Sequence, residues 1–160
     1  MYKSNDLIGK PVISLETDKQ IGFIKDLILF WNEGMVKYFY LETGTILNKN
    51  DIAVPIKNFK RLAGDWVPLV SLEALEKIHD DQGERWSDYK GRKIISNWGR
   101  EIGFLAEIIF SFPDGKIDCI EISDGLLKDF INGREKVPLK AFETFSENMI
   151  IIKEDLGGDN

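Results

Sequence analysis

One segment of this chain occurs twice, and this repeat constrains the fold more than any other feature of the sequence. Residues 19–29 read KQIGFIKDLIL, and residues 99–110 read GREIGFLAEIIF. In both copies Ile-Gly-Phe is followed by an aliphatic residue, then by an acidic residue two positions later, and then by an apolar pair. We therefore predict that one small folding unit is present twice.

The repeat extends beyond this segment. Gly91 follows Gly9 by 82 positions, whereas Gly103 follows Gly22 by 81, so one residue is missing from the turn between Gly91 and Gly103. Each half holds roughly 70 to 75 residues, which is near the lower size limit of a self-sufficient core. We expect the two halves to be less stable when separated than in the intact chain.

Short apolar and β-branched runs between glycines, prolines and polar turns predict strands in both halves. Residues 21–30 and 35–41 are expected to pair, and residues 117–123 are the corresponding partner strand of the second copy; residues 126–131 and 135–137 are expected to form a hairpin around the Asn-Gly pair at 132–133. Gly22 near the start of a strand predicts a bulge or bend, which small barrels use to curl a sheet. We predict a mainly β protein with two small antiparallel β-barrels in tandem, because closure removes exposed sheet edges.

After the first unit, the spacing of hydrophobic residues changes from that of a strand to that of a helix, which predicts a short joining helix at residues 71–79. Leu72, Leu75 and Ile78 recur every three residues, and Ser71 is a suitable N-cap. The predicted organisation is a first unit at 1–70, a helical linker at 71–83, a second unit at 84–155 and an acidic tail at 156–160.

These segments resemble the PRC-barrel domain family. The resemblance rests on residues 7–12, 21–27 and 54–56 in the first copy and on residues 89–94, 102–108 and 137–139 in the second. The family includes the cytoplasmic domain of the photosynthetic reaction-centre H subunit and the C-terminal domain of a ribosome maturation factor. The resemblance implies a protein-binding or assembly module, and it provides no catalytic residues. The sequence has neither the membrane helix of the H subunit, which argues against a photosynthetic role, nor the N-terminal domain of the maturation factor, which weakens a ribosomal role.

The amino-acid composition limits which class of partner the protein binds and in which cellular compartment it is found. Hydrophobic residues make up 43% and charged residues 30%, as in an ordinary soluble globular protein, and the net charge is −6. Polyphosphate backbones attract clustered Lys and Arg, so this balance disfavours nucleic acid as the main partner. A single cysteine, no apolar run of membrane-spanning length and no signal-peptide core favour a cytoplasmic location.

The residues that carry nucleophilic or metal chemistry are scarce. His79 is the only histidine, at the end of the predicted helix, where it can face the last carbonyl groups. Cys119 lies inside a predicted strand, where a buried, inert thiol is the simpler interpretation. We expect no enzymatic activity, no cofactor and no metal site.

Four residues are candidates for an interface: Trp31, Trp98, Asp26 and Glu107. Trp31 and Trp98 lie in predicted turns, where they serve either a binding interface or packing over the end of a barrel. Asp26 and Glu107 occupy the same repeat position inside apolar strands. Either that face meets water, which we favour, or the carboxylates are partly buried and accept hydrogen bonds from backbone or an arginine.

These observations favour a non-enzymatic interaction or assembly module that binds a protein partner or self-associates. An RNA-processing or ribosome-associated factor is the alternative, which the resemblance allows and the charge opposes. An enzyme with an unrecognised site is the third hypothesis, and the scarcity of His and Cys makes it the weakest.

Overall fold

The computed structural model describes residues 1–45, 48–75, 83–124, 134–146 and 148–153, and the positions at which the predicted helix ends and the Asn-Gly hairpin turns lie outside these ranges. The chain divides into two compact units, which are described separately. Unit 1 comprises Met1–Ser87 and Phe110–Ile117, and unit 2 comprises Asp88–Ile109 and Asp118–Asn160.

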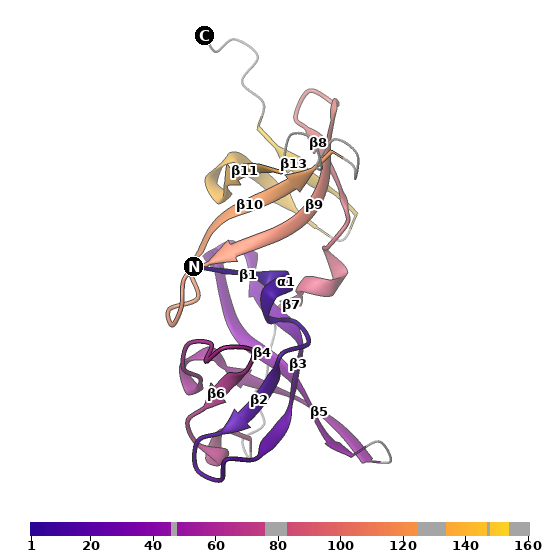
Figure 1. The fold of residues 1–160 in the computed structure, drawn as a ribbon. Helices are drawn as coiled ribbons and strands as arrows, with labels where there is room; N and C mark the ends of the chain where they lie inside the picture. The colour runs from indigo at the N-terminus through magenta and orange to yellow at the C-terminus, as the bar shows by residue number, and fades with distance from the viewer. Residues whose placement is uncertain (46–47, 76–82, 125–133, 147, 154–160) are drawn as a thin grey trace. The chain divides into compact units, whose positions relative to one another are not determined.

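Strands dominate both units, so the predicted mainly β fold is confirmed (Figure 1). The first part of the chain forms β1 (Tyr2–Lys3), α1 (Ser4–Leu7), β2 (Pro11–Ser14), β3 (Gln20–Phe30), η1 (Trp31–Glu33), β4 (Met35–Thr45), β5 (Asn48–Pro55), η2 (Ile56–Asn58), β6 (Val67–Leu69), η3 (Leu72–Leu75), β7 (Glu84–Arg85) and η4 (Trp86–Asp88). The later part forms β8 (Lys93–Ser96), β9 (Glu101–Phe110), β10 (Ile117–Ser123), β11 (Glu135–Pro138), η5 (Leu139–Ala141), β12 (Phe142–Phe145) and β13 (Ile150–Ile152).

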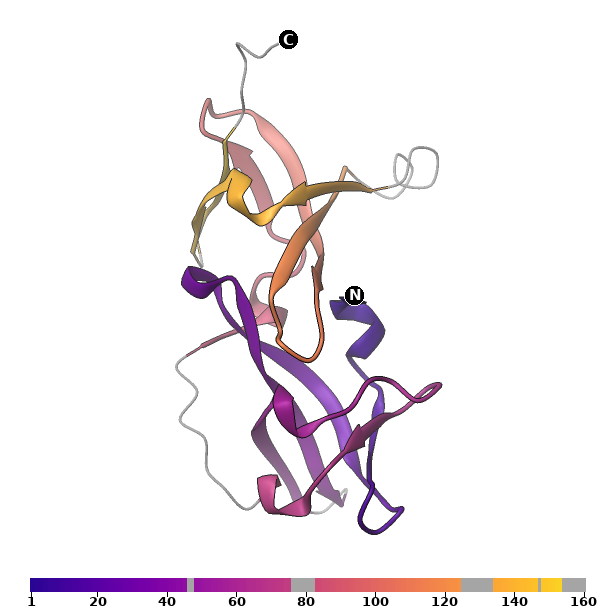
Figure 2. The ribbon, with the colours of Figure 1, turned by 90° about the vertical axis from the view of Figure 1, so that its left-hand side faces the viewer.

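The two sheets share one topology. Their strand orders are β5-β4-β3-β2-β6 and β11-β10-β9-β8-β13-β12, and the long strands β3 and β4 curve along their length (Figure 2). In each sheet one pairing is parallel, β2 with β6 and β8 with β13. The prediction of purely antiparallel sheets was therefore wrong, because the chain crosses over and returns beside the strand that opened the repeat.

The strand pairings of the described residues do not close either sheet into a barrel, contrary to the prediction. Prolines explain part of this result, because a proline has no N–H to continue a ladder. Pro55 ends β5 and Pro68 lies in the middle of β6, which are the two edges of the first sheet. Pro138 ends the edge strand β11 in the second.

The predicted bulge near the repeated glycine is confirmed in both copies. Between β2 and β3, Val12 pairs with Gly22 and Ile13 pairs with Gln20, so one residue of β3 is unpaired. Between β8 and β9, Ile94 pairs with Gly103 and Ile95 pairs with Glu101, so one residue of β9 is unpaired in the same way. A Cβ atom on Gly22 would lie 2.0 Å from the carbonyl oxygen of Glu42, which explains why the position is glycine.

The missing residue is also found in the turn that the repeat indicated. Ser14 N–H donates to the carbonyl of Lys19, whereas Ser96 N–H donates to the carbonyl of Arg100, so the second turn is one residue shorter. The left-handed position is occupied by Asp18 in the first turn and by Gly99 in the second.

The predicted joining helix is not shown. The described part of this segment is η3, a single 3-10 turn in which the Glu73 N–H donates to Ser71 Oγ at 3.2 Å. The Ala74 N–H donates to the Ser71 carbonyl, so Ser71 caps the turn as predicted. His79 lies outside the described residues.

The compact units do not coincide with the sequence repeats, because unit 1 takes two segments from the second repeat. β7 pairs antiparallel with β3, and the turn at 110–117 hydrogen-bonds to β4, where Val36 N–H donates to the Gly115 carbonyl at 2.8 Å. Phe112 lies 6 % exposed in the core of unit 1, with its ring stacked 6.4 Å from that of Phe39. The core of unit 1 is thus completed by residues from beyond the predicted boundary at 83.

Candidate interaction site

Trp98 presents a large indole on an ordered turn of unit 2. It exposes 67 % of its surface, more than any other large hydrophobic residue in the described ranges. Ser96 Oγ accepts hydrogen bonds from the N–H groups of Trp98 at 3.2 Å and Arg100 at 3.1 Å. The Asn97 N–H donates to the Ile152 carbonyl and ties the turn to β13. The backbone beneath the indole is therefore already ordered, which lowers the entropy cost of using it in binding.

The equivalent turn of unit 1 carries a different residue at this place. Ser14 Oγ accepts from the N–H groups of Glu16 and Thr17, so Glu16 corresponds to Trp98. The Glu16 carboxylate accepts a hydrogen bond of 2.6 Å from the Leu72 N–H. One turn is thus used within its own unit, while the other presents an exposed aromatic residue.

Trp31 differs from Trp98 in its exposure. It begins η1, directly after β3, and it is half-buried within unit 1. The Gly34 N–H donates to the Trp31 carbonyl at 3.1 Å and closes this turn. As an interface residue Trp31 stays a prediction, and it offers less accessible indole than Trp98.

Asp26 is buried, so the favoured interpretation that its face meets water was wrong. It is 4 % exposed, and its Oδ1 accepts from the N–H groups of Leu27 at 2.8 Å and Ser87 at 3.1 Å. Its Oδ2 accepts from the Ser87 hydroxyl. The carboxylate thereby satisfies two backbone donors at the point where the second repeat begins.

Glu107 is buried as well, and the solvated interpretation was wrong here for the same reason. It is 6 % exposed in β9, and its Oε2 lies 3.6 Å from Arg134 Nη1. The same nitrogen lies 3.8 Å from Glu121 Oε1, whose residue is 3 % exposed in β10. The arginine compensates two buried carboxylates, which would otherwise be costly to remove from water.

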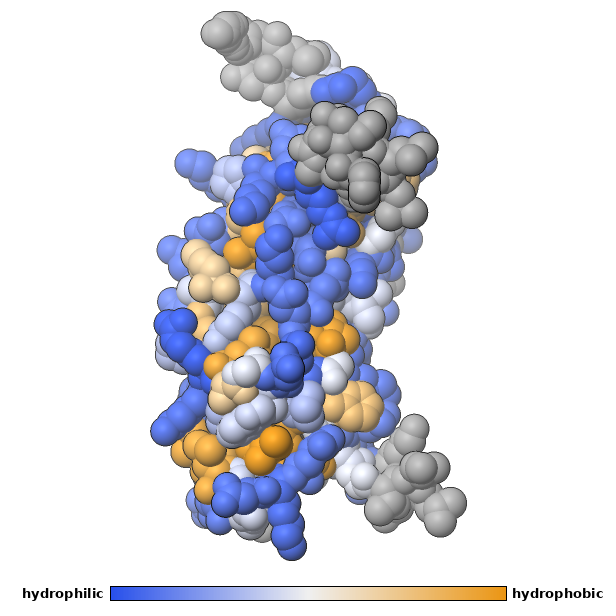
Figure 3. Space-filling view, viewed as in Figure 1, coloured by the Kyte–Doolittle hydropathy of each residue, from blue (hydrophilic) through white to orange (hydrophobic). Residues whose placement is uncertain are grey.

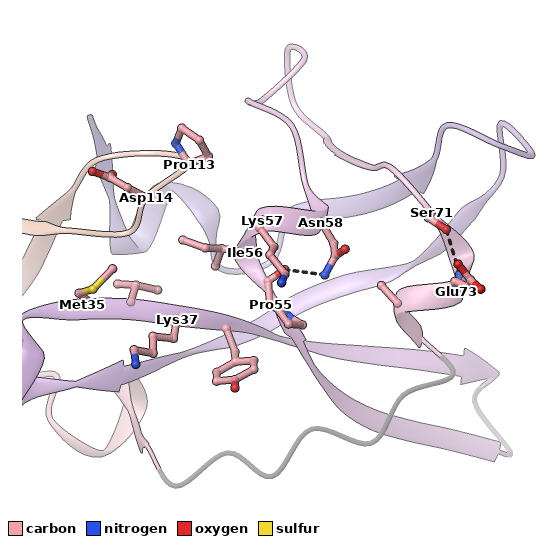
Figure 4. A pocket seen from close by; sticks show the side chains of 13 residues that line it. Met35, Lys37, Pro55, Ile56, Lys57, Asn58, Ser71, Glu73, Pro113 and Asp114 are labelled. Atoms are coloured by element: carbon pink, nitrogen blue, oxygen red, sulfur yellow. Dashed lines mark hydrogen bonds between the residues drawn. The ribbon is translucent and has the colours of Figure 1, made fainter.

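A pocket of about 520 Å³ opens on unit 1 (Figure 4). Its lining is mixed: Met35, Val36, Tyr38, Pro55, Ile56, Ala74 and Pro113 are joined by Lys37, Lys57, Asn58, Ser71, Glu73 and Asp114. Lys37 Nζ forms a salt bridge of 2.6 Å with Glu33 Oε1 and lies over the face of the Phe30 ring. The Ser111 hydroxyl holds the pKa of Asp114 below its usual value by a hydrogen bond to the carboxylate. No pair of residues in this pocket has the geometry of a nucleophile and its base among the described contacts.

A smaller pocket of about 280 Å³ lies in unit 2 beside the Trp98 turn. We call it the unit 2 pocket, and its lining is Arg100, Ile102, Ile122, Glu135, Val137, Ala141, Ile152 and Lys153. Arg100 and Ile152 connect it to the turn through the hydrogen bonds described above. The pocket has apolar walls with charged groups around them.

The residues considered for chemistry stay apart from these surfaces. Cys119 is half-buried in β10, and burial raises the pKa of its thiol, with the neighbouring Asp118 charge adding to the shift. In the described ranges no group of three His, Cys, Asp or Glu side chains is placed to hold a metal ion. No helix there is long and apolar enough to cross a membrane.

Two functional positions were missed from the sequence although a signal existed. Ser14 and Ser96 are buried and organise the two turns, and they lie 82 positions apart, as do Gly9 and Gly91. Glu121 was missed because nothing in its own strand distinguishes a buried glutamate from an exposed one.

Exposed apolar residues are spread over both units. The face shown in Figure 3 carries hydrophobic patches interrupted by hydrophilic residues. The large hydrophobic residues that are exposed in the described ranges are Met1, Leu15, Val70, Trp98, Phe104 and Met149. Trp98 stands out because it combines the greatest exposure with an adjoining pocket.

The fold and its internal repetition define a tandem small-domain β protein. The sequence profile of the PRC-barrel domain matches residues 1–75 and again residues 81–157, so the chain belongs to the PRC-barrel domain family and carries two copies. No curated protein matches the chain.

Proposed function

We propose that the chain is a non-enzymatic interaction module that docks a protein partner through the Trp98 turn of unit 2. The observation that carries this proposal is the 67 % exposure of Trp98 on a turn held by Ser96. Tryptophan is enriched among residues that dominate binding energy. A rigid turn presents it at low conformational cost.

The rival RNA-binding function has less support from the basic residues near the start of unit 2. Lys93 Nζ lies 2.9 Å from Glu101 Oε1, and the Arg92 Nε donates to the Asp88 carbonyl. Cations held by neighbouring acceptors are less available to phosphates, and the net charge of −6 repels a polyanion. The proposal of a protein partner therefore fits these contacts better.

The test is capture of proteins from the native cell with the wild-type chain and with Trp98→Ala, compared by quantitative mass spectrometry. We expect Trp98→Ala to weaken binding of the captured partner by about 1 to 2 kcal/mol with little change in thermal stability. Leu15→Ala is the matched control, because Leu15 is 41 % exposed in the equivalent turn of unit 1. A partner that binds Trp98→Ala as tightly as the wild type would refute the proposed docking site.

A further inference from the structure

The larger pocket, which we call the unit 1 pocket, is a second surface that the Trp98 turn does not use. Its volume of about 520 Å³ lies within the range of about 300 to 1,000 Å³ that is typical of binding pockets. Its floor is apolar, because the buried residues Val36 and Ile56 line it together with the half-buried Met35 and Pro55. An occupant of this pocket therefore needs an apolar part.

The rim of the unit 1 pocket is open to solvent. Four of the lining residues are exposed, and they are Lys57, Glu73, Pro113 and Asp114. Three of these four carry a charge at neutral pH, so the rim can select an occupant by its charges as well as by its apolar part.

The charges of the rim follow one another along the pocket in the order negative, positive, negative. Figure 4 shows Asp114 at one end, Lys57 near the middle and Glu73 towards the other end. Lys37 also lines the pocket, but its charge is compensated by Glu33 at 2.6 Å and is not counted here. The rim is thus not uniformly acidic or basic.

The turn η2 holds the central lysine between the two acidic residues. Ile56 begins η2 and adjoins the turn of Asp114, because a Cβ atom on Gly115 would lie 2.7 Å from Ile56 Cδ1. Asn58 ends η2, and its carbonyl accepts a hydrogen bond of 2.8 Å from the segment just before the turn of Glu73. The order of the charges is therefore fixed by backbone and core contacts within unit 1.

These three charges are available to an occupant. Among the described contacts neither Lys57 nor the Glu73 carboxylate forms an ion pair. One carboxylate oxygen of Asp114 accepts a hydrogen bond from the Ser111 hydroxyl. That bond holds the pKa of Asp114 below its usual value, so the carboxylate stays ionised at neutral pH.

We propose that the unit 1 pocket binds a short segment of a protein partner in which one acidic residue stands between two basic residues, with apolar residues separating them. The acidic residue pairs with Lys57, and the basic residues pair with Asp114 and Glu73. The apolar side chains lie on the floor at Val36 and Ile56. Only a ligand with several charges in sequence matches this rim, and a polypeptide provides them. The inference goes beyond docking through the Trp98 turn, because it assigns a separate site to unit 1.

The probe is the peptide Lys-Leu-Glu-Leu-Lys, blocked at both ends and titrated into the full-length chain. Nuclear magnetic resonance spectra report amide shifts and detect weak binding. We expect saturable shifts at the amides of Val36, Ile56 and Ala74. The control peptide Lys-Lys-Leu-Leu-Glu has the same composition and net charge in a different order, and it should bind at least about threefold more weakly.

A charge reversal at the centre of the rim locates the site. Lys57→Glu should weaken binding of the probe at least about threefold, because it places like charges together. Lys60→Glu is the matched control, since it reverses the charge of an exposed lysine outside the lining and should leave the affinity unchanged. A peptide with a central lysine, Lys-Leu-Lys-Leu-Lys, should bind Lys57→Glu more tightly than it binds Lys60→Glu. Both positions are exposed, so neither reversal threatens the fold.

Three results would overturn the inference. An absence of saturable shifts up to the solubility limit of the probe would exclude this occupant. Equal affinity of the reordered peptide, or equal losses in Lys57→Glu and Lys60→Glu, would reduce binding to attraction between a cationic peptide and a protein of net charge −6. Trp98→Ala should leave the affinity for the probe unchanged, so failure of this site and failure of the Trp98 turn are distinguished.

Discussion

Asp26 illustrates why a carboxylate inside an apolar strand requires a partner that the local sequence does not reveal. Its carboxylate accepts hydrogen bonds from the N–H of Leu27, the next residue, and from the N–H of Ser87, which lies 61 positions later. The alternation pattern of the strand suggested a solvated face because it contains only local information. The correct alternative, a carboxylate bonded to backbone donors, depended on a segment that the repeat assigned to the other half.

The first prediction at this scale concerns Asp26→Ala. The substitution leaves the buried Leu27 N–H and the partly buried N–H and hydroxyl of Ser87 without their acceptor, so we expect a loss of about 1–3 kcal/mol in the free energy of unfolding. Urea denaturation measures it. The control is Asp65→Ala, whose side chain is fully exposed, with an expected change within about 0.5 kcal/mol. Equal effects of the two substitutions would show that the buried carboxylate does not stabilise the fold.

The second prediction concerns the reactivity of Cys119. Burial and the Asp118 charge both raise the pKa of its thiol, which means that the thiolate fraction at a given pH is lower than in a free cysteine. The rate of alkylation by iodoacetamide should therefore rise with pH through a midpoint above about 8.5, the usual value. Asp118→Asn removes one cause and should move the midpoint downward. A midpoint below that of a free cysteine would contradict the expected environment.

At the scale of elements, the two serine turns perform the same structural task with different consequences. Ser14 and Ser96 each accept two backbone hydrogen bonds, but only the second turn carries an exposed tryptophan. The sequence repeat predicted the pairing of these turns and even their difference in length. It could not predict which turn presents its side chain, because Glu16 finds its partner at Leu72, 56 positions away.

The third prediction follows from this difference. Ser96→Ala and Ser14→Ala should each lower the free energy of unfolding by about 1 kcal/mol, since each removes one acceptor from two amides. Only Ser96→Ala should also weaken partner capture, because it loosens the turn beneath Trp98. Stability and capture are measured on the same preparations. Equal losses of capture in both variants would indicate a general effect of destabilisation and not a role for the Trp98 turn.

At the scale of the whole molecule, the sequence predicted the duplication and the mainly β class but not how the chain divides into compact units. Repeated glycines identify turns and bulges because those positions need glycine locally. The placement of residues 84–87 and 110–117 in unit 1 depends on long-range packing, such as Phe112 against Phe39 and Ser87 against Asp26. The predicted joining helix is not shown in the described residues, where the three-residue period corresponds to a capped 3-10 turn at Leu72–Leu75.

The fourth prediction concerns separation of the halves. A chain ending at Gly83 lacks the hydroxyl and N–H of Ser87 and the buried Phe112, so it should unfold at a lower temperature than the intact protein. Differential scanning calorimetry of fragments 1–83 and 84–160, alone and mixed, provides the comparison. Fragments that melt at the temperature of the intact chain would show that the shared segments contribute nothing to stability.

The most direct test of the central claim is to compare protein binding with RNA binding by the intact chain at low and moderate salt. The wild type and Trp98→Ala are each presented with the captured partner and with total cellular RNA. The account predicts partner binding that depends modestly on salt and is weakened by Trp98→Ala, with little RNA retained at either salt concentration. Tight RNA binding that falls steeply with salt and survives Trp98→Ala would contradict it and favour the RNA-binding alternative.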